Sequence, residues 1–285
     1  GRFEDLRRVF DRLGGGDLRI QAILIAFCFG GLLEALAGFG APVAITATMI
    51  LSLGVKPLKA AVTVLIANTA PVAFGAVAVP ITTAADVGGK DAHVIATIVG
   101  HQAPFLAMLV PLILLVILDG MKGLKDAWLP ALVIGVSFAI AQWVTAATPA
   151  YNLTDVVACI VSMGVAVVFL QFWKPRGVAG VRERYGLPAQ AEEKEALPAV
   201  RVWMALLPYV IVVAIFGVAN LHAGLKAWLK SFVIKIDIQA LSSRLVTADG
   251  KPVKDAVYNF AWMSNPGTLL IISGLVVAVV YFFFN

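Results

Sequence analysis

The stretch IQAILIAFCFGGLLEALAGFGAPVAITATMILSLGV, residues 20–55, holds a single charged residue, Glu34, in 36 positions. A straight helix of this length would extend about 54 Å, whereas the hydrocarbon core of a bilayer is about 30 Å thick. The stretch must therefore bend if it lies in a membrane. The sequence offers one place, GFGAP at residues 38–42, because glycine permits unusual backbone angles and proline readily starts a helix.

Two helical arms, over 18–37 and 42–53, are expected on either side of this tip. Basic residues flank both outer ends of the pair: Arg19, Lys56 and Lys59. Because positive residues accumulate on the cytoplasmic side of a membrane, both ends belong on one side. We therefore predict a re-entrant hairpin over 18–54.

The next uncharged run, residues 60–85, is also interrupted, by NTAP at 68–71. Proline does not fit in a helix interior but fits well in a first turn. We predict a discontinuous transmembrane helix over 57–85, with arms at 57–67 and 71–85 and an unwound segment between them. Pro42 and Pro71 would then each stand where a second arm begins.

The composition is that of a membrane protein. Hydrophobic residues make up 60% and charged residues 14%, against about 25% charged in ordinary soluble domains. The charges, net +5, gather in short clusters between long apolar runs, which excludes a soluble enzyme, a disordered tail and a nucleic-acid-binding module. The expected fold class is all-α, a polytopic integral membrane protein in the lipid bilayer, with further spans at 93–118, 127–147, 154–173, 202–221 and 266–284.

The chain divides into four predicted parts: a cytoplasmic N-terminal segment at 1–17, a membrane transport domain at 18–173, a cytoplasmic loop at 174–201, and two further spans within 202–285. Lysine and arginine in the loops set the orientation. They place 119–126 and 174–201 inside and 148–153 outside. The segment 222–265 would then be extracellular although it carries six Lys or Arg residues, and we assign part of it to an interfacial helix.

The two breaks are the candidate binding site. Lipid cannot satisfy free backbone groups, so non-helical backbone at membrane depth lies inside protein or beside a water-filled cavity. Helix N-termini at such breaks attract anions, and both breaks could face one carboxylate. Asn68 and Thr69 offer an amide and a hydroxyl that donate and accept hydrogen bonds. The alternative is that the breaks are packing kinks and that these two side chains cap local backbone groups.

Two ionisable residues are candidates for proton coupling. Glu34 lies four residues before the tip, and an ionisable group inside a membrane is functional by default. His101 lies within an apolar span, and histidine as a residue type can change its charge near neutral pH; it is the weaker candidate. Each could instead be a hydrogen-bonded packing residue.

Enzyme signatures are missing. The tip begins like a dinucleotide-binding loop, but Val43 stands where the third glycine should be. Cys28 and Cys159 lie in apolar runs without metal-ligand spacing, and we read them as small buried hydrophobes. We expect no enzyme, no catalytic residue, no metal and no cofactor.

Several motifs resemble the lactate permease family. They are FCFG at 27–30, EALAGFGAPVAIT at 34–46, ANTAPVAFGA at 67–76, GHQAPF at 100–105 and SFAIAQ at 137–142. The resemblance implies a multi-pass permease of the bacterial inner membrane that carries lactate, and often glycolate, together with protons. It also implies one repeat of an ion-coupled carrier built from two inverted repeats.

The site that the resemblance implies combines the tip with the unwound segment. Its substrate-binding residues would be Gly38, Phe39, Gly40, Ala41, Pro42, Asn68, Thr69, Ala70, Pro71 and Phe74. Glu34 would be the leading proton carrier, followed by His101, which stands where several relatives are expected to have arginine.

Family members are about twice as long as this chain. The chain has no initiator methionine and no polar tail after its last apolar run, so we expect a fragment that lacks the second repeat of the same protein. A homo-oligomer stays open. The alternative functions are a sodium-coupled carrier of another small organic anion and a non-transporting membrane subunit.

Overall fold

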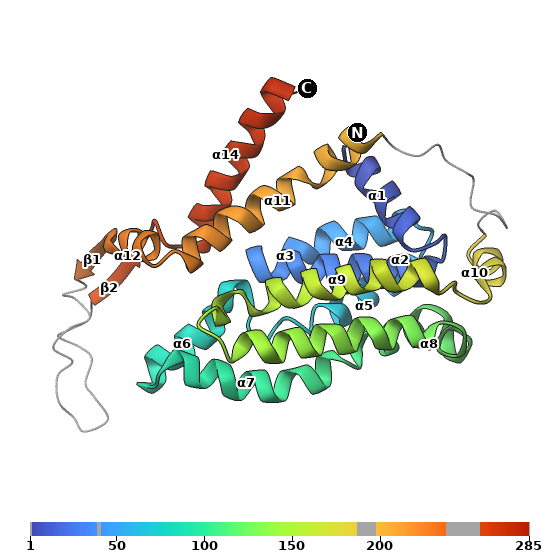
Figure 1. Cartoon of the computed structure of the whole chain (residues 1–285), viewed down its shortest axis with the longest axis horizontal. Coiled ribbons are helices and arrows are strands. Elements are labelled where there is room, and N and C mark those ends of the chain that lie inside the picture. Colours follow the sequence, from blue (N-terminus) through green and yellow to red (C-terminus); the bar gives the residue numbers. More distant parts are fainter. Residues whose placement is uncertain (1, 39–40, 187–197, 238–256, 285) are drawn as a thin grey trace. The chain divides into compact units, whose positions relative to one another are not determined.

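The computed structural model describes residues 2–38, 41–186, 198–237 and 257–284 (Figure 1). The chain forms two compact units, Gly1–Val213 and Ala214–Asn285. The predicted tip residues Phe39 and Gly40 lie outside the described residues.

The first unit is a set of helices that include one π-helix, η1, and two short 3-10 helices, η2 and η3. In chain order these are α1 (Arg2–Leu13), α2 (Leu18–Ile23), η1 (Leu24–Phe29), α3 (Gly30–Ala37), α4 (Ala41–Ser52), α5 (Pro57–Ala67), η2 (Ala76–Ala78), α6 (Val79–Gly88), α7 (Ala92–Ala107), α8 (Val110–Ala146), η3 (Tyr151–Leu153), α9 (Thr154–Phe172), α10 (Val178–Arg184) and the beginning of α11 (Ala199–Leu221).

The second unit contains the end of α11 and a short mixed segment before the last helix. Its other elements are α12 (Ala223–Ser231), β1 (Val233–Asp237), β2 (Val257–Ala261) and α14 (Pro266–Phe284). The strands are antiparallel, with Val233 opposite Ala261, so the predicted loop at 222–265 includes a strand pair that the sequence analysis missed. α12 coincides with the predicted interfacial helix, and burial together with Lys230 lowers the pKa of Lys226 on it.

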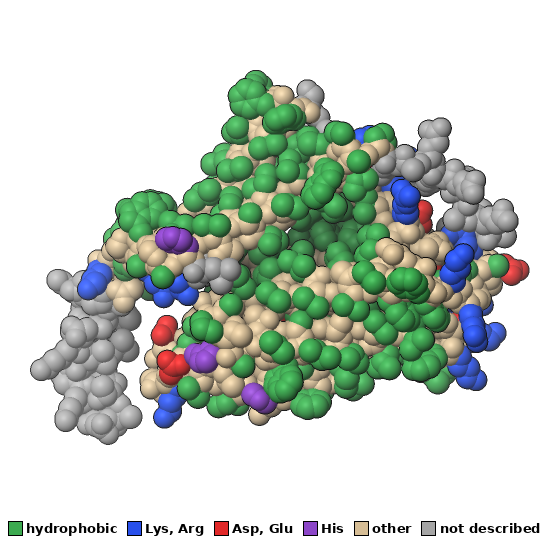
Figure 2. All heavy atoms as spheres, in the orientation of Figure 1, with side chains coloured by type: hydrophobic (Ala, Val, Ile, Leu, Met, Phe, Trp, Pro, Cys, Tyr) green, Lys and Arg blue, Asp and Glu red, His purple; other side chains and the backbone are tan. Residues whose placement is uncertain are grey.

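Five helical segments among the described residues are long and apolar enough to cross a membrane. They are Leu18–Leu36, Ala92–Ala146, Tyr151–Phe172, Ala199–Ala219 and Gly267–Phe284. In the first unit, hydrophobic side chains cover much of the visible surface, while Lys and Arg gather at the end that holds α10 (Figure 2). The predicted fold class, an all-α polytopic membrane protein, is confirmed, with the strand pair as a small addition.

The predicted hairpin arms correspond to two packed helical segments. α2, η1 and α3 follow one another without a gap, and α4 packs back against η1 and α3. Arg19, at the start of α2, bonds Asp119, and Lys59, in the first turn of α5, bonds the adjacent Leu118 carbonyl. The chain therefore enters and leaves the hairpin at the same end of the unit. The depth of this hairpin in a membrane stays a prediction.

The discontinuous helix breaks over a longer stretch than predicted. α5 ends at Ala67, turns follow up to Phe74, and the second arm, α6, begins at Val79 rather than at Pro71. The physical reason is a run of backbone angles that no right-handed helix contains. Gly75, Val77 and Ala78 all have φ values between 50° and 57°.

α7 and α8 also differ from the predicted spans 93–118 and 127–147. A turn at Met108 and Leu109 interrupts the first span, and the predicted loop at 119–126 is helical apart from Gly120. α8 bends at Gly120 and Ala127 and packs against α7. Gly135 allows the close approach of α8 to the turn, because a Cβ atom there would clash with the Met108 carbonyl oxygen.

Arg19 is buried completely, although the sequence analysis treated it as a surface residue at a helix end. Its guanidinium binds the Asp17 carboxylate at 2.7 Å, Asp119 at 3.2 Å and Asp126 at 3.4 Å. It also donates to the Arg176 carbonyl at 2.7 Å. One side chain thus joins the start of the hairpin, the bend in α8 and the segment after α9.

We expect Arg19→Gln to lower the stability of the protein strongly. Removing one partner of a buried ion pair leaves an uncompensated charge, which typically costs about 3–5 kcal/mol. The matched control is Arg184→Gln, because Arg184 binds the same Asp119 at 2.6 Å but its side chain is 42% exposed. Thermal unfolding in detergent should show a large fall in midpoint for the Arg19 variant and a small one for the control. Equal shifts would contradict a central role for Arg19.

Candidate functional site

A cavity of about 600 Å³ lies where the hairpin meets the broken helix. Glu34 and Gly38 line it from α3 and its C-terminal end, and the remaining lining residues come from the break and α6. Those residues are Val72, Gly75, Ala76, Val79, Pro80, Thr83, Ala84 and Val87. The two predicted breaks are therefore adjacent in the structure.

The contact between the two breaks depends on a glycine. Gly38 has φ +63° and ψ −162°, a conformation that is essentially restricted to glycine. A Cβ atom at Gly38 would lie 2.8 Å from the Cβ atom of Ala76. Glycine is thus required here twice, once for its backbone angles and once for close approach.

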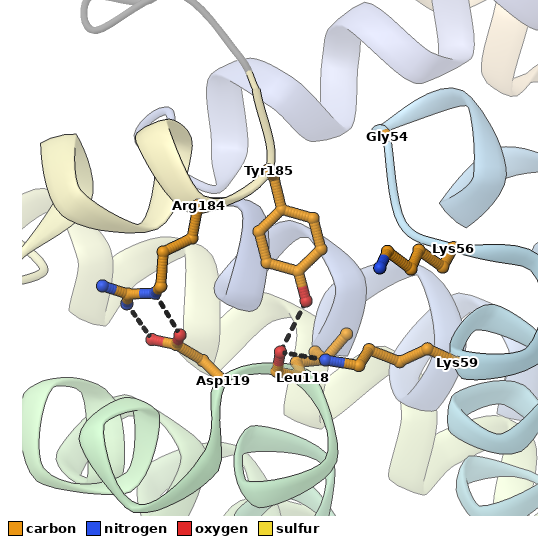
Figure 3. A pocket seen from close by; sticks show the side chains of 7 residues that line it. All are labelled: Gly54, Lys56, Lys59, Leu118, Asp119, Arg184 and Tyr185. Carbon is orange, nitrogen blue, oxygen red and sulfur yellow. Dashed lines mark hydrogen bonds and ion pairs between the residues drawn. The ribbon is translucent and has the colours of Figure 1, made fainter.

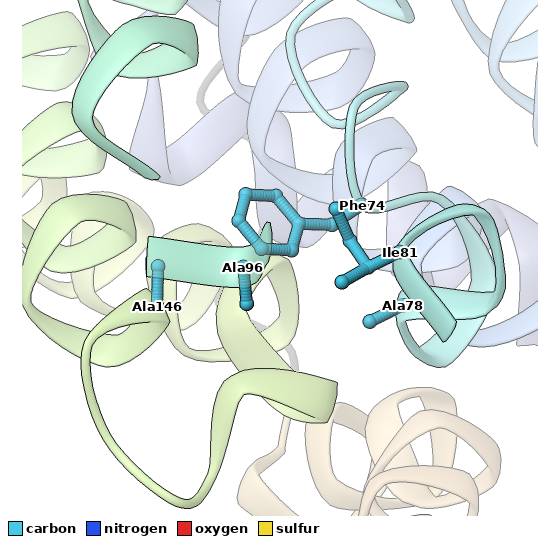
Figure 4. Packing of buried hydrophobic residues seen from close by; sticks show 5 residues of the cluster. All are labelled: Phe74, Ala78, Ile81, Ala96 and Ala146. Atoms are coloured by element: carbon cyan, nitrogen blue, oxygen red, sulfur yellow. The ribbon is translucent and has the colours of Figure 1, made fainter. Parts of the chain in front are cut away.

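The break itself is strained. Val77 and Ala78 both lie in the left-handed region, where each residue other than glycine costs about 1–3 kcal/mol. Packing compensates for this cost, since Ala78 belongs to a buried cluster with Phe74, Ile81, Ala96 and Ala146 (Figure 4). Strained backbone that its surroundings hold in place is common at binding sites.

The cavity combines one acid with the beginning of a helix. Glu34 is 7% exposed and is the only charged residue among the described residues that line the cavity. Val79 and Pro80, in the first turn of α6, lie in the same lining. The helix dipole gives this end of α6 a partial positive charge, while the Val79 N–H donates to the Ala76 carbonyl and Pro80 has no N–H. The lining thus brings one acid together with the positive end of a helix dipole.

The other predicted substrate residues are not part of this lining. Asn68 is half-buried, and the exposed Thr69 donates its hydroxyl to the Ile66 carbonyl at 2.6 Å, which is the local capping role left open above. Ala70 and Pro71 are buried beside the turns. A substrate role for these four residues stays a prediction.

Three further predicted residues have different surroundings. Ala41 begins α4, and the carbonyl of the buried Pro42 accepts a hydrogen bond from the Thr46 hydroxyl at 2.8 Å. Phe74 is 1% exposed and packs inside the hydrophobic cluster of the break. Its position there supports the shape of the break rather than the lining of the cavity.

His101 does not join Glu34 in the cavity lining. It lies exposed on α7, where its Nδ1 atom is 2.6 Å from the Thr97 carbonyl oxygen. Its ring meets Trp143 edge-on at 6.0 Å between centroids. The structure thus separates the two predicted proton carriers.

Thr83 is a lining residue that the sequence analysis missed. It contributes the only hydroxyl among the described lining residues. Residues 79, 83 and 87 are four positions apart, a spacing that predicts one shared face of a helix. This face of α6 lines the cavity. Placing the second arm at Pro71 instead of Val79 hid this face.

A second cavity, of about 500 Å³, lies at the basic end of the unit. The Leu118 carbonyl accepts hydrogen bonds from Lys59 at 3.1 Å and from the Tyr185 hydroxyl at 2.5 Å, and Arg184 binds Asp119 with two nitrogens (Figure 3). Burial, and then the charge of Asp119, raise the pKa of Tyr185, so its hydroxyl stays protonated as a donor. These bonds join α5 and the end of α10 to the bend in α8.

Metal binding has no support in the described part of the chain, where no three His, Cys, Asp or Glu side chains gather in a group that could hold an ion. Cys28 and Cys159 are buried and free, as predicted.

The apolar helices of membrane-spanning length and the helix broken between α5 and α6 define a multi-pass integral membrane protein. Residues 1–284 match the family model described as L-lactate permease. The chain belongs to this permease family, whose members it joins as an integral protein of the bacterial inner membrane.

Curated relatives agree with the family model. The L-lactate permease of Bacillus subtilis (strain 168) is 37% identical over 282 residues, which cover 91% of this chain and 50% of that protein. The glycolate permease GlcA of Escherichia coli (strain K12) is 38% identical over 280 residues, with the same coverage. The chain spans about half the length of the curated relatives it matches. No solved structure matches it.

We expect Gly38→Ala to destabilise the protein by about 1–3 kcal/mol, because alanine is strained at this φ and ψ and its methyl group would meet Ala76. The control is Gly164→Ala on α9, where a Cβ atom would have nothing within 4 Å and alanine favours the helix. Thermal unfolding in detergent should separate the two variants. A midpoint for Gly38→Ala at or above that of the unchanged protein would contradict the described contact between tip and break.

Proposed function

We propose that the full-length protein carries lactate and related 2-hydroxy monocarboxylates across the membrane together with protons, and that this chain supplies one half of the binding site. The observation that carries the proposal is the cavity between the hairpin tip and the broken helix, with Glu34 and the first turn of α6 in its lining. A second repeat of the same protein would complete the site. On this view the protein is a carrier rather than an enzyme.

The cavity supports a direct coupling of anion and proton. A substrate carboxylate would be attracted by the positive end of the α6 dipole but repelled by an ionised Glu34 in the same cavity. The anion therefore binds best when Glu34 holds a proton. Release of the proton lowers the affinity of the cavity for the anion, and release of the anion lowers its affinity for the proton. Anion and proton therefore move together.

The substrate class follows from the relatives and from the cavity. The relatives' names specify L-lactate and glycolate, which share a carboxylate and a neighbouring hydroxyl. The Thr83 hydroxyl in the lining can donate to or accept from such a hydroxyl. The small apolar residues around it suit a ligand of this size.

We expect proteoliposomes with the full-length protein to accumulate labelled L-lactate when a proton gradient is imposed, and excess glycolate to reduce the uptake. Accumulation that follows a sodium gradient and ignores the proton gradient would replace the proposal with a sodium-coupled carrier. No transport of either acid by correctly inserted protein would support a non-transporting subunit.

Glu34→Gln should keep lactate exchange but lose proton-driven accumulation. Glutamine resembles the neutral acid in shape and charge, so the anion still binds while no proton is exchanged. Counterflow and gradient-driven uptake measured on the same vesicles separate these two activities. The control is Asp86→Asn, which removes an exposed carboxylate from α6 and should change neither. Normal accumulation in the Glu34 variant would remove this residue from the coupling.

A further inference from the structure

A second buried acid lies outside the cavity lining, at the beginning of α9. Asp155 is 2% exposed, and Gln142 on α8 is fully buried. The Gln142 amide nitrogen donates to Asp155 Oδ1 at 2.8 Å. Asp155 Oδ2 and Gln142 Oε1 are buried without a hydrogen-bond partner among the described residues. A buried polar atom left in this way costs about 1–3 kcal/mol, so this pair requires an explanation.

One proton on Asp155 would give each of these two atoms a partner. A protonated Asp155 carries a donor on Oδ2, and the Gln142 oxygen is an acceptor that lacks a donor. The acid would donate to the amide oxygen while the amide nitrogen donates to the acid oxygen, as in a cyclic acid–amide pair. An ionised Asp155 would instead leave two acceptors unsatisfied and bury a charge.

The titratable neighbours also favour the neutral acid. Cys159 lies one turn further along α9, and the elements that pack closely against α9 contribute Cys28 from η1, Glu34 from α3 and Tyr151 from η3. All four groups are neutral or negative in each of their states. The charged residues of α8 (Asp119, Lys122, Lys125 and Asp126) lie toward its opposite end. The elements α9, α3, η1 and η3 contain no Lys, Arg or His. His93 on α7 is the nearby group that can become positive; it is exposed, its ring lies 6.0 Å from the Tyr151 ring, and its Nε2 atom is 3.1 Å from the Ala147 carbonyl oxygen.

Asp155 also lies close behind the cavity. A Cβ atom at Gly31 on α3 would be 2.8 Å from the Cys159 sulfur, so α3 and α9 touch at this point. The two segments run in opposite directions, because Arg19 before α3 binds the backbone that follows α9. Glu34 and Asp155 therefore both lie about one turn beyond the Gly31 contact, toward the same end of the unit. η2, in the strained break, packs against α9 and η3.

From these observations we propose that Asp155 and Gln142 form a proton-binding site that the carrier uses in its transport cycle, one helix layer behind Glu34. The proton binds at Asp155 Oδ2 and is shared with Gln142 Oε1. It leaves when the movement of α9 or of the break admits water to the pair. This inference rests on the proposed proton coupling and adds a second acid to it.

The first test is infrared spectroscopy of the full-length protein in lipid at neutral pH, which needs no substrate. We expect a C=O stretching band of a protonated carboxyl group that disappears in Asp155→Asn. In Gln142→Leu the same band should move to higher frequency, because the acid loses its amide donor. A band that neither variant changes would overturn the proposal, and the Gln142 variant keeps the test decisive if Asp155→Asn fails to fold.

The second test measures coupling in proteoliposomes. Asn fits the site of Asp155, since an amide can also donate to and accept from Gln142. We expect Asp155→Asn to keep lactate counterflow while the ratio of internal to external lactate under a proton gradient falls but stays above one, because Glu34 still exchanges a proton. The control is Asp91→Asn, an exposed N-cap of α7 that asparagine also caps well. An unchanged ratio in Asp155→Asn would overturn the proposal. Absence of lactate transport by the unchanged protein would reject the proposed function, while the infrared result would still report on the proton.

Discussion

The bonds of the buried Arg19 guanidinium fix the relative positions of several segments of the first unit. It binds three carboxylates and one backbone carbonyl that come from separate parts of the chain. A cation without solvent needs such partners, because the cost of its desolvation is large. The requirement brings the start of the hairpin, the bend in α8 and the end of α9 to one place. The first turn of α5 joins them through Lys59 and the Leu118 carbonyl.

The location of the cavity depends on this arrangement of segments. Because the hairpin begins and α5 follows at the same end, the hairpin tip and the break after α5 both fall within the unit rather than at its ends. There Gly38 meets Ala76, and the strained backbone at Val77 and Ala78 is held by the cluster around Phe74. Irregular backbone of this kind is tolerated inside a membrane only within protein or beside water. The Gly38–Ala76 contact and the cluster around Phe74 thus hold irregular backbone next to the cavity that Glu34 lines.

Local sequence signals predicted the helical arms well where one local feature, such as apolar length or a glycine, decides where a helix ends. The length of the apolar run and the glycines of the tip predicted the first two arms to within one residue of the run from α2 to α3 and of α4. The second arm of the broken helix was misplaced, since Pro71 is a good helix start but Gly75 and the left-handed residues after it prevent a helix before Val79. Phe74 was proposed from its place in a motif and His101 from its ionisable side chain within an apolar span, and neither signal gives the direction in which a side chain points.

The sequence by itself determined the membrane class, the approximate bounds of α9, α11 and α14, the presence of the two breaks and the family, because hydrophobic length and backbone propensity act over a few neighbouring residues. Only the tertiary structure decided that Arg19 is buried, that Glu34 shares a cavity with α6, and that Gln142 pairs with Asp155. These features are contacts between elements. The role of a buried polar group depends on the partners that folding brings to it. The order of residues along one helix does not specify those partners.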